Sequence, residues 1–319
     1  MDEKSTENLV PKVIYYCWFG GEKPKKVLDC IKNWQEKMPD YQIIEVNETN
    51  KELFDVEEEC KKNKWFKICY EHKIWALVSD YARLKVLYNK GGIYFDTDIT
   101  IEGNIQEIIN KNKLVVGWEN NKYINAAVII SAKNDKNIKQ MSDFYDVRIW
   151  NEPIYTIPAI MTTVLKENYN LNKYSQITEN EEILVLPPDC FYPIPVGIHN
   201  VTRNEISSYL TSETITVHWN HGNWSPYSSS NNILYFGKHK HNCDLNKLLD
   251  YCFIEKTIIE NPFIKITKFC TSSSININWY WLFRFKYRSD INKNRWLVLF
   301  LFGIKIKLFK IENGEKRSS

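Results

Sequence analysis

The sequence predicts an α/β fold with a mostly parallel central sheet. Short β-prone runs alternate with segments of helical periodicity over the first hundred residues, in the order strand, helix, strand, helix, strand. The chain of 319 residues can bury a substantial core, and its composition, 44% hydrophobic and 25% charged, is typical of a globular protein. Ligands of such sheets bind where the parallel strands end, so we expect a site at the strand ends.

The first elements form a strand–helix–strand unit. Residues 13–18 (VIYYCW) read as a buried strand that ends at the turn Phe19-Gly20-Gly21. Pro24, a residue that suits the first helical turn, begins a predicted helix that continues to about Lys37. Residues 41–46 form the second strand, and residues 51–73 are charged and predicted to be partly helical.

The stretch 74–98 is the centre of the chain's organisation. Its first part has apolar residues at helical spacing, and Gly91 and Gly92 end this helix because glycine adopts C-cap conformations at little cost. The apolar run 93–95 is a short strand that places Asp96 and Asp98 at its end. The residues at helical spacing are Ile74, Leu77, Val78, Tyr81, Leu84 and Tyr88.

The remaining chain continues the mixed pattern and then changes. Further strands are predicted at 114–118, 126–131, 182–186 and 214–219, with helices at 137–148 and at the end of 153–166, and a proline-rich loop at 187–195. We predict two domains, residues 1–243 and a helical, basic extension over residues 244–319. The extension ends in an apolar segment, 295–310, which reads either as a packed hairpin or as a membrane-surface segment.

Charge and cysteine content narrow the class of protein. The net charge of +3 is too small to indicate a nucleic-acid partner. Eight cysteines are scattered without a CxxC pair, and the start Met-Asp-Glu-Lys is not a signal peptide, which favours a reduced cytoplasmic setting. The sequence has no apolar run of the ~18 residues that a transmembrane helix needs. Peripheral association with the inner face of the plasma membrane stays open because of the tail.

Carboxylates and nearby polar residues suggest a cation site. Asp96 and Asp98 at the end of an apolar strand suit Mg²⁺ or Mn²⁺, although such pairs also occur in solvated turns. Asp80 and Arg83, one helical turn apart, belong either to the same site or to an ordinary salt bridge. Trp18, followed by two glycines, either stacks on a base or belongs to the core.

Histidines late in the chain offer a further metal ligand. His218 and His221 lie three residues apart, and His239 and His241 two apart near Cys243, so a zinc site is conceivable. The spacing is not that of a zinc finger, and one histidine completing the aspartate-bound cation site is the better interpretation.

Three blocks together resemble a known enzyme family. VIYYCWFGG, SDYARLKVLYNKGGIYFDTD and HWNHGNW, in this order, are similar to the glycosyltransferases with a DXD sugar-binding region, family 32 and its bacterial capsule-type relatives, and more distantly to the large clostridial glucosylating toxins. The resemblance covers roughly residues 10–225. It implies a GT-A fold, a nucleotide-sugar donor, a Mn²⁺ or Mg²⁺ ion, and transfer with retention of anomeric configuration.

The resemblance also implies roles for individual residues. Trp18 would stack on the base with Ser79 beside it, Tyr94 would lie against the nucleotide, and Trp224 near the diphosphate. One departure is Asn223, which stands where the family usually has serine. The residues implied to act on the sugar, the diphosphate or the metal are Asp80, Arg83, Asp96, Asp98, Asn125 and His218, of which Asp96, Asp98 and His218 would be metal ligands.

The sequence therefore predicts a retaining, metal-dependent glycosyltransferase of bacterial surface-polysaccharide biosynthesis. Its donor would be a UDP-sugar, and its acceptor a polysaccharide or a lipid-linked oligosaccharide. Two alternatives stay open. A phosphatase of the haloacid-dehalogenase type would use Asp96 as nucleophile, Asp98 as acid/base and Thr100 in support, and a membrane-surface interaction module would use the apolar and basic tail.

Overall fold

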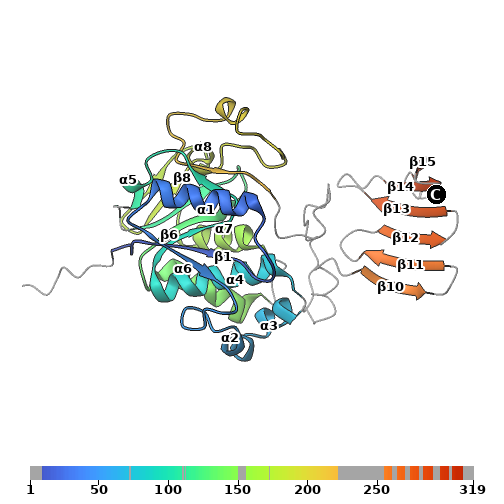
Figure 1. The fold of residues 1–319 in the computed structure, drawn as a ribbon, viewed down its shortest axis with the longest axis horizontal. Helices are drawn as coiled ribbons and strands as arrows, with labels where there is room; N and C mark the ends of the chain where they lie inside the picture. The colour runs from blue at the N-terminus through green and yellow to red at the C-terminus, as the bar shows by residue number, and fades with distance from the viewer. Residues whose placement is uncertain are drawn as a thin grey trace, which may run out of the picture. The chain divides into compact units, whose positions relative to one another are not determined.

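The structure is a computed structural model that divides into two compact units, residues 1–232 and 233–319. It describes residues 9–71, 73–109, 111, 113–149, 156–171 and 173–221, together with the backbone of six strands between 255 and 311. The predicted domain boundary at 243 and the boundary between the units both fall outside these described residues. Each unit is therefore considered by itself (Figure 1).

A seven-stranded sheet forms the centre of the first unit, in the order β2-β1-β3-β6-β5-β8-β7. The neighbours β2, β1 and β3 are parallel, β6 is antiparallel to both β3 and β5, β5 and β8 are parallel, and β7 is antiparallel to β8. Five of the seven strands thus run in one direction, which confirms the predicted α/β fold with a mostly parallel central sheet. The strands are β1 (Val13–Cys17), β2 (Gln42–Val46), β3 (Gly92–Phe95), β5 (Leu114–Trp118), β6 (Ile124–Ser131), β7 (Thr178–Glu179) and β8 (Ile183–Leu186).

Helices connect these strands, and two of them cover opposite faces of β1 (Figure 1). Successive residues of a strand point to opposite faces. The Tyr16 ring packs 5.8 Å from the Trp34 ring of α1, whereas the Cys17 Sγ lies 4.0 Å from the Ser79 carbonyl oxygen of α4. The helices are α1 (Lys25–Lys37), α2 (Val56–Lys62), α3 (Lys64–Glu71), α4 (Trp75–Lys90), α5 (Gln106–Ile109), α6 (Lys136–Asp143), α7 (Ile157–Asn168) and α8 (Pro188–Phe191).

Smaller elements complete the first unit. The predicted helix at 137–148 is α6 followed by a π-helical turn over Phe144–Arg148, and the predicted loop 187–195 contains the one-turn helix α8, which Pro188 begins. A 3₁₀ turn lies at Ile206–Ser208. The strands β4 (Ile99–Ile101) and β9 (Thr216–His218) pair with each other in a separate antiparallel ribbon.

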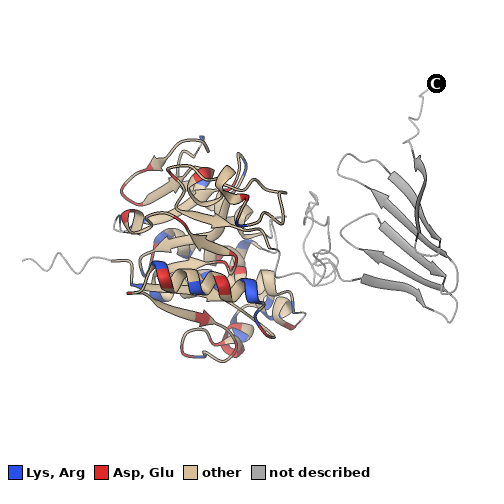
Figure 2. Ribbon diagram, turned by 45° about the horizontal axis from the view of Figure 1, so that its top comes forward, with Lys and Arg blue, Asp and Glu red and all other residues tan. Residues whose placement is uncertain are grey.

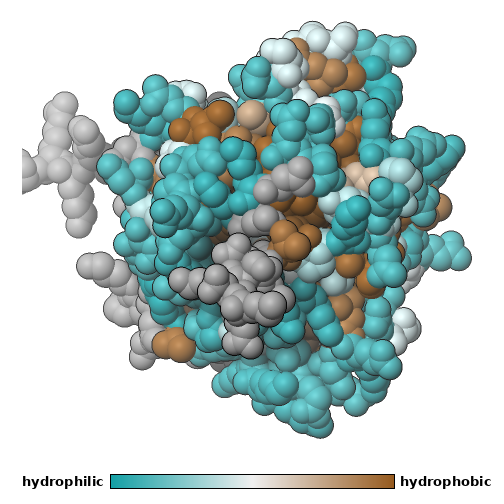
Figure 3. All heavy atoms as spheres, turned by 90° about the vertical axis from the view of Figure 1, so that its left-hand side faces the viewer, coloured by the Kyte–Doolittle hydropathy of each residue, from teal (hydrophilic) through white to brown (hydrophobic). Residues whose placement is uncertain are grey.

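The surface of the first unit is mixed in charge and hydropathy. Acidic and basic residues are interspersed over the described helices, and the face drawn in Figure 3 is largely hydrophilic with smaller hydrophobic patches (Figures 2 and 3). On α1, for example, Lys25 pairs with Asp29 at 2.6 Å and Lys32 with Glu36 at 3.6 Å. Such exposed pairs contribute little to stability.

The turn from α4 into β3 requires glycine. Gly91 has φ 68° and ψ 177°, and its N–H donates to the Leu87 carbonyl. A Cβ at this position would lie 2.5 Å from the backbone nitrogen of Lys133. The short turn therefore sends the chain directly from α4 into β3, and with it the residues that follow β3.

Replacing Gly91 by alanine is expected to lower the free energy of unfolding of the first unit by at least about 2 kcal/mol, because backbone strain and a backbone clash add. Urea unfolding followed by tryptophan fluorescence measures the effect. Gly197→Ala is the matched control, since Gly197 also has a positive φ, 91°, but has nothing within 4 Å of the added Cβ. Equal losses in both variants would contradict the role assigned to the clash.

The described part of the second unit is a six-stranded antiparallel sheet, so the predicted helical extension is wrong for these residues. Runs such as SININW and FRFKY alternate polar and apolar residues with a period of two, which favours strands over helices. In the tail, the backbone of β14 and β15 pairs antiparallel as a hairpin. The strands are β10 (Glu255–Glu260), β11 (Ile264–Phe269), β12 (Ser274–Trp279), β13 (Phe283–Ser289), β14 (Arg295–Leu301) and β15 (Ile304–Ile311).

Each helix in the described part of the chain is too short or too polar to cross a bilayer.

Candidate active site

The polar residues predicted to form a site meet at one edge of the seven-stranded sheet. Trp18 follows β1 and Asp96 follows β3, so both lie at the carboxyl ends of parallel strands. Asn125 is near the start of the antiparallel β6 and therefore lies at the same edge. The Asp96 N–H donates to the Ala127 carbonyl at 2.8 Å, which joins the end of β3 to the beginning of β6.

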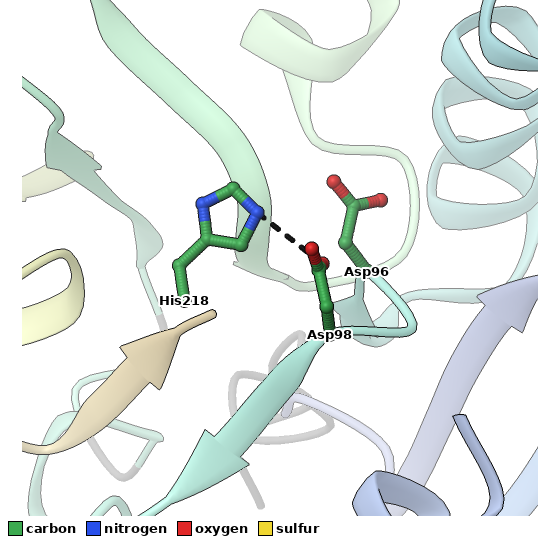
Figure 4. Close-up of side chains that lie close together, drawn as sticks. All are labelled: Asp96, Asp98 and His218. Atoms are coloured by element: carbon green, nitrogen blue, oxygen red, sulfur yellow. Dashed lines mark ion pairs between the residues drawn. The ribbon is translucent and has the colours of Figure 1, made fainter. Parts of the chain in front are cut away.

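A cluster of three possible metal ligands lies at this edge. One ligand atom from each of Asp96, Asp98 and His218 lies within 4.8 Å of the others (Figure 4). The pairing of β4 with β9 produces this arrangement, since Ile99 is the register partner of His218. The Trp219 N–H also donates to the Asp98 carbonyl at 2.9 Å. Two segments about 120 residues apart in sequence thus share one site.

Asp98 is held by two groups from the second segment. Its Oδ1 lies 3.2 Å from the Nε2 of His218, and its Oδ2 accepts a hydrogen bond of 2.9 Å from the His221 N–H. Burial by itself would raise the pKa of the Asp98 carboxyl, but His218 and the His221 N–H outweigh burial and lower it. Burial opposes the charged form of His218, yet the adjacent Asp98 carboxylate raises the His218 pKa to about 9.

Arg83 forms a second, more deeply buried cluster beside the first. Its Nη2 donates to Asp80 Oδ1 at 2.9 Å, while its Nη1 lies 3.1 Å from Asp96 Oδ1 and donates to the Ala126 carbonyl at 2.9 Å. The guanidinium carbon is 4.5 Å from the centre of the Tyr94 ring. Because the Tyr94 hydroxyl also donates to Asp96 Oδ1 at 2.9 Å, this cluster fixes the Asp96 carboxylate.

The Arg83 cluster contains one cation and two carboxylates. Burial raises the pKa of Asp80 to about 7, with Arg83 opposing the shift and Asp96 adding to it. Burial likewise opposes the charge of Arg83, but Asp96 and Asp80 keep its pKa above the usual value. Arg83 is only 4% exposed and therefore acts as a fixed positive charge behind the sheet edge.

The donor set of the three-residue cluster fits a hard divalent cation. Among the described residues, the contacts of the Asp96 carboxylate go through Oδ1, which leaves Oδ2 for a ligand. Two carboxylates with a single imidazole suit Mn²⁺ or Mg²⁺ better than a tetrahedral zinc centre with several nitrogen or sulfur ligands. Asp96, Asp98 and His218 would hold this ion.

The predicted nucleotide-binding residues are in different environments. Trp18 is 8% exposed, and its Nε1 donates to the Gly21 carbonyl at 3.1 Å, while the space beside the Gly21 Cα is open. Ser79 is fully buried, with a hydroxyl that has no hydrogen-bond partner in the described part of the chain. Tyr94 is also fully buried, so its hydroxyl acts on a ligand through Asp96. Trp224 and Asn223 lie outside the described residues.

Two residues at this edge were missed by the sequence-based reasoning. Glu119 follows β5 and accepts a hydrogen bond of 2.7 Å from the Asn125 side-chain amide. Tyr192 packs its ring 5.9 Å from the His218 ring, and its hydroxyl lies 3.5 Å from the Asn125 carbonyl oxygen. Glu119 could have been found by the rule that applied to Asp96, because it also follows a predicted strand. For Tyr192, in the proline-rich segment, the sequence had no such signal.

The geometry does not favour the phosphatase alternative. Its supporting residue, Thr100, donates its hydroxyl to Glu102 at 2.7 Å and accepts the Trp219 indole N–H at 2.9 Å. The proposed nucleophile, Asp96, is held by Arg83 and Tyr94. Thr100 is also fully buried, so its hydroxyl is not accessible to a ligand at the sheet edge.

Comparison with known proteins finds a similarity in the first third of the chain. Residues 24–115 match the family model described as a glycosyltransferase sugar-binding region containing a DXD motif. Residues 24–115 are thus similar to a glycosyltransferase sugar-binding region. The matched region extends from the start of α1 into β5 and includes Asp80, Arg83, Asp96 and Asp98. Its DXD motif is Asp96-Thr97-Asp98, at the centre of the candidate site.

Curated relatives extend the similarity. Human lactosylceramide 4-alpha-galactosyltransferase is 26% identical over 161 residues, which cover 47% of this chain and 43% of that protein. Subversion of eukaryotic traffic protein A of Legionella pneumophila is 26% identical over 174 residues, which cover 44% of this chain and 27% of that protein. The chain thus spans less than half the length of each of these relatives.

A solved structure of PaToxG Glycosyltransferase is also similar, with 19% sequence identity and a TM-score of 0.40 over 50% of this chain and 69% of that chain. This similarity is weak both in identity and in superposition.

Proposed function

We propose that the protein is a retaining, metal-dependent glycosyltransferase that moves a hexose from a nucleotide-sugar to an acceptor hydroxyl. The observation that carries the proposal is the meeting of Asp96, Asp98 and His218 at the end of β3, where the two aspartates belong to the matched region 24–115. The first unit would be the catalytic domain, of GT-A type, because its parallel strands end at this site.

The chemistry requires stabilisation of a charged leaving group. Transfer breaks the bond between the anomeric carbon and the diphosphate oxygen, and both electrons leave with the diphosphate. A Mn²⁺ or Mg²⁺ ion bound by Asp96, Asp98 and His218 would supply Lewis-acid stabilisation of that leaving group. Arg83 adds a fixed positive potential from behind Asp96, at 3.1 Å, and is already oriented before the reaction.

The finer assignments rest on sequence resemblance and on the relatives. The relatives named lactosylceramide 4-alpha-galactosyltransferase form an alpha linkage on a glycolipid, according to that name. By analogy, the donor here would be a UDP-sugar and the acceptor a polysaccharide or lipid-linked oligosaccharide of the bacterial surface. The protein would act in the cytoplasm, peripherally at the inner face of the plasma membrane, a setting compatible with the free cysteines among the described residues.

Hydrolysis of a panel of nucleotide-sugars in the absence of acceptor tests this proposal. We expect release of UDP from at least one UDP-sugar with Mn²⁺, and loss of that release when the metal is chelated. Glycosyltransferases commonly leak donor to water, so the measurement does not depend on knowing the acceptor. Turnover that is equal with and without metal would contradict the proposal, as would phosphate release from simple phosphomonoesters in place of nucleotide release.

A further inference from the structure

Glu119 is a carboxylate of the sheet edge that lies outside the DXD motif. It follows β5, and its Oε1 accepts the Asn125 Nδ2 hydrogen bond at 2.7 Å, while Oε2 lies 3.3 Å from the Asn120 amide nitrogen. Its N–H donates to the Tyr123 carbonyl, which closes the β5–β6 turn around it. The side chain is half-buried, and the surrounding turn holds it at the edge.

The hydrogen bond to Glu119 fixes the amide of Asn125. Asn125 Oδ1 accepts the Ala127 N–H at 2.7 Å, so the oxygen end of the amide is already occupied by backbone. One N–H of Nδ2 goes to Glu119, and the other remains as a donor. Asn125 is only 7% exposed, and a flip of its amide, which would exchange the oxygen and the nitrogen, would lose these short hydrogen bonds. The group presented at the edge is therefore an N–H donor.

The backbone at Asn125 lies between the two clusters of the site. The carbonyl of Ala126, the next residue, accepts from Arg83. On the other side, the Tyr192 hydroxyl lies 3.5 Å from the Asn125 carbonyl oxygen, and the Tyr192 ring contacts His218. Asn125 thus lies next to the carboxylates that would hold the cation.

The strand order assigns a direction to a ligand lying along this edge. The order β1-β3-β6-β5 places Trp18 on one side of the Asp96–Asp98 pair, and Asn125 and Glu119 on the other. A diphosphate on the cation would extend both ways from β3. When the base of the nucleotide occupies the open space at Gly21, beside Trp18, the sugar of the donor extends in the other direction, over β6 toward the end of β5.

We propose that Glu119 is a positioning residue for the donor sugar: it orients Asn125 so that an amide N–H faces a hydroxyl of the transferred sugar. This inference rests on the proposed function and deepens it. It predicts that Glu119 affects binding of the sugar part of the donor and leaves binding of the nucleoside diphosphate part unchanged.

Titration calorimetry on the full chain with Mn²⁺ tests the inference, using UDP and the UDP-sugar that the donor panel selects. Glu119→Ala is expected to weaken UDP-sugar binding about tenfold, the size of one well-oriented hydrogen bond, while UDP binds as in the wild type. Glu119→Gln is expected to restore UDP-sugar binding to within about twofold, because the glutamine oxygen still accepts from Asn125. Glu182→Ala, which removes a carboxylate at the opposite edge beside β8, is the control and should bind both ligands normally.

Three outcomes would overturn the inference. The first is equal weakening of UDP and UDP-sugar by Glu119→Ala, which would put the base at this end of the site. The second is unchanged binding of both ligands in a folded Glu119→Ala protein. The third is unchanged binding with a large loss of turnover in both Glu119→Ala and Glu119→Gln, which would make Glu119 a catalytic acid or base. Failure of the wild type to bind UDP with Mn²⁺ would instead contradict the proposed function itself.

Discussion

Replacing Asp98 by asparagine is expected to lower metal-dependent hydrolysis of the UDP-sugar by at least about 100-fold, the scale on which electrostatic stabilisation of a transition state acts. Asparagine has the same shape and keeps an oxygen for the His221 N–H, but it loses the negative charge that a divalent cation requires. Asp98 is 7% exposed and faces His218 at 3.2 Å, so a neutral side chain also leaves His218 without its counter-charge. Initial rates at saturating Mn²⁺ measure the effect.

The control for this experiment is a carboxylate elsewhere on the same unit. Asp29 on α1 is exposed and pairs only with Lys25 in the contacts described, so Asp29→Asn should retain wild-type turnover. Circular dichroism shows whether the Asp98→Asn protein is folded. If the Asp98→Asn variant is folded and its turnover stays within threefold of wild type, the catalytic role assigned to the DXD motif is contradicted.

Replacing Arg83 by methionine is expected to lower the free energy of unfolding of the first unit by about 3–5 kcal/mol, as for loss of one partner from a buried ion pair. Arg83 lies between Asp80 and Asp96, and removing it leaves two carboxylates next to each other without a cation. The Ala126 carbonyl also loses its donor. Methionine preserves most of the side-chain volume, so the loss measures mainly charge and hydrogen bonding.

Arg148 is the matched control for this substitution. Arg148 pairs with Glu167 at 2.7 Å, but their side chains are 33% and 50% exposed. Exposed pairs contribute about 0–1 kcal/mol, so Arg148→Met should shift the urea midpoint only slightly. Similar losses in both variants would mean that the Arg83 cluster is no more important for stability than a surface ion pair.

Local sequence patterns were sufficient for much of the fold and for half of the site. The helix α4, its glycine end and the strand β3 follow from periodicity and from the glycines themselves, and they place Asp80, Arg83, Asp96 and Asp98 together within one continuous segment. These contacts span fewer than twenty residues, which is the range over which helix and strand geometry determine position.

The other half of the site depends on contacts distant in sequence. His218 reaches Asp98 because β9 pairs with β4, and a three-residue strand has too short a pattern to predict its partner. The hydrogen bond between Glu119 and Asn125 depends on the β5–β6 turn. The ring contact between Tyr192 and His218 depends on the tertiary packing of a loop. Residue spacing alone contains no information on either contact.

The C-terminal unit shows the opposite failure, in which a local pattern was present but misinterpreted. The basic part of the extension before residue 295 was predicted to be helical, whereas its polar and apolar residues alternate with the period of two that is typical of strands. The strand pairing now described, with β13 between β12 and β14, follows the chain order of a simple meander.

Titration of UDP into the protein of residues 1–319, with Mn²⁺ and with a chelator, tests the central claim most directly, because it needs neither the sugar nor the acceptor. The account predicts one UDP bound per chain with Mn²⁺, at least about tenfold weaker binding with the chelator, and the same weakening in Asp98→Asn with Mn²⁺ present. Equally tight binding of UDP with and without metal, and in wild type and Asp98→Asn alike, would contradict it.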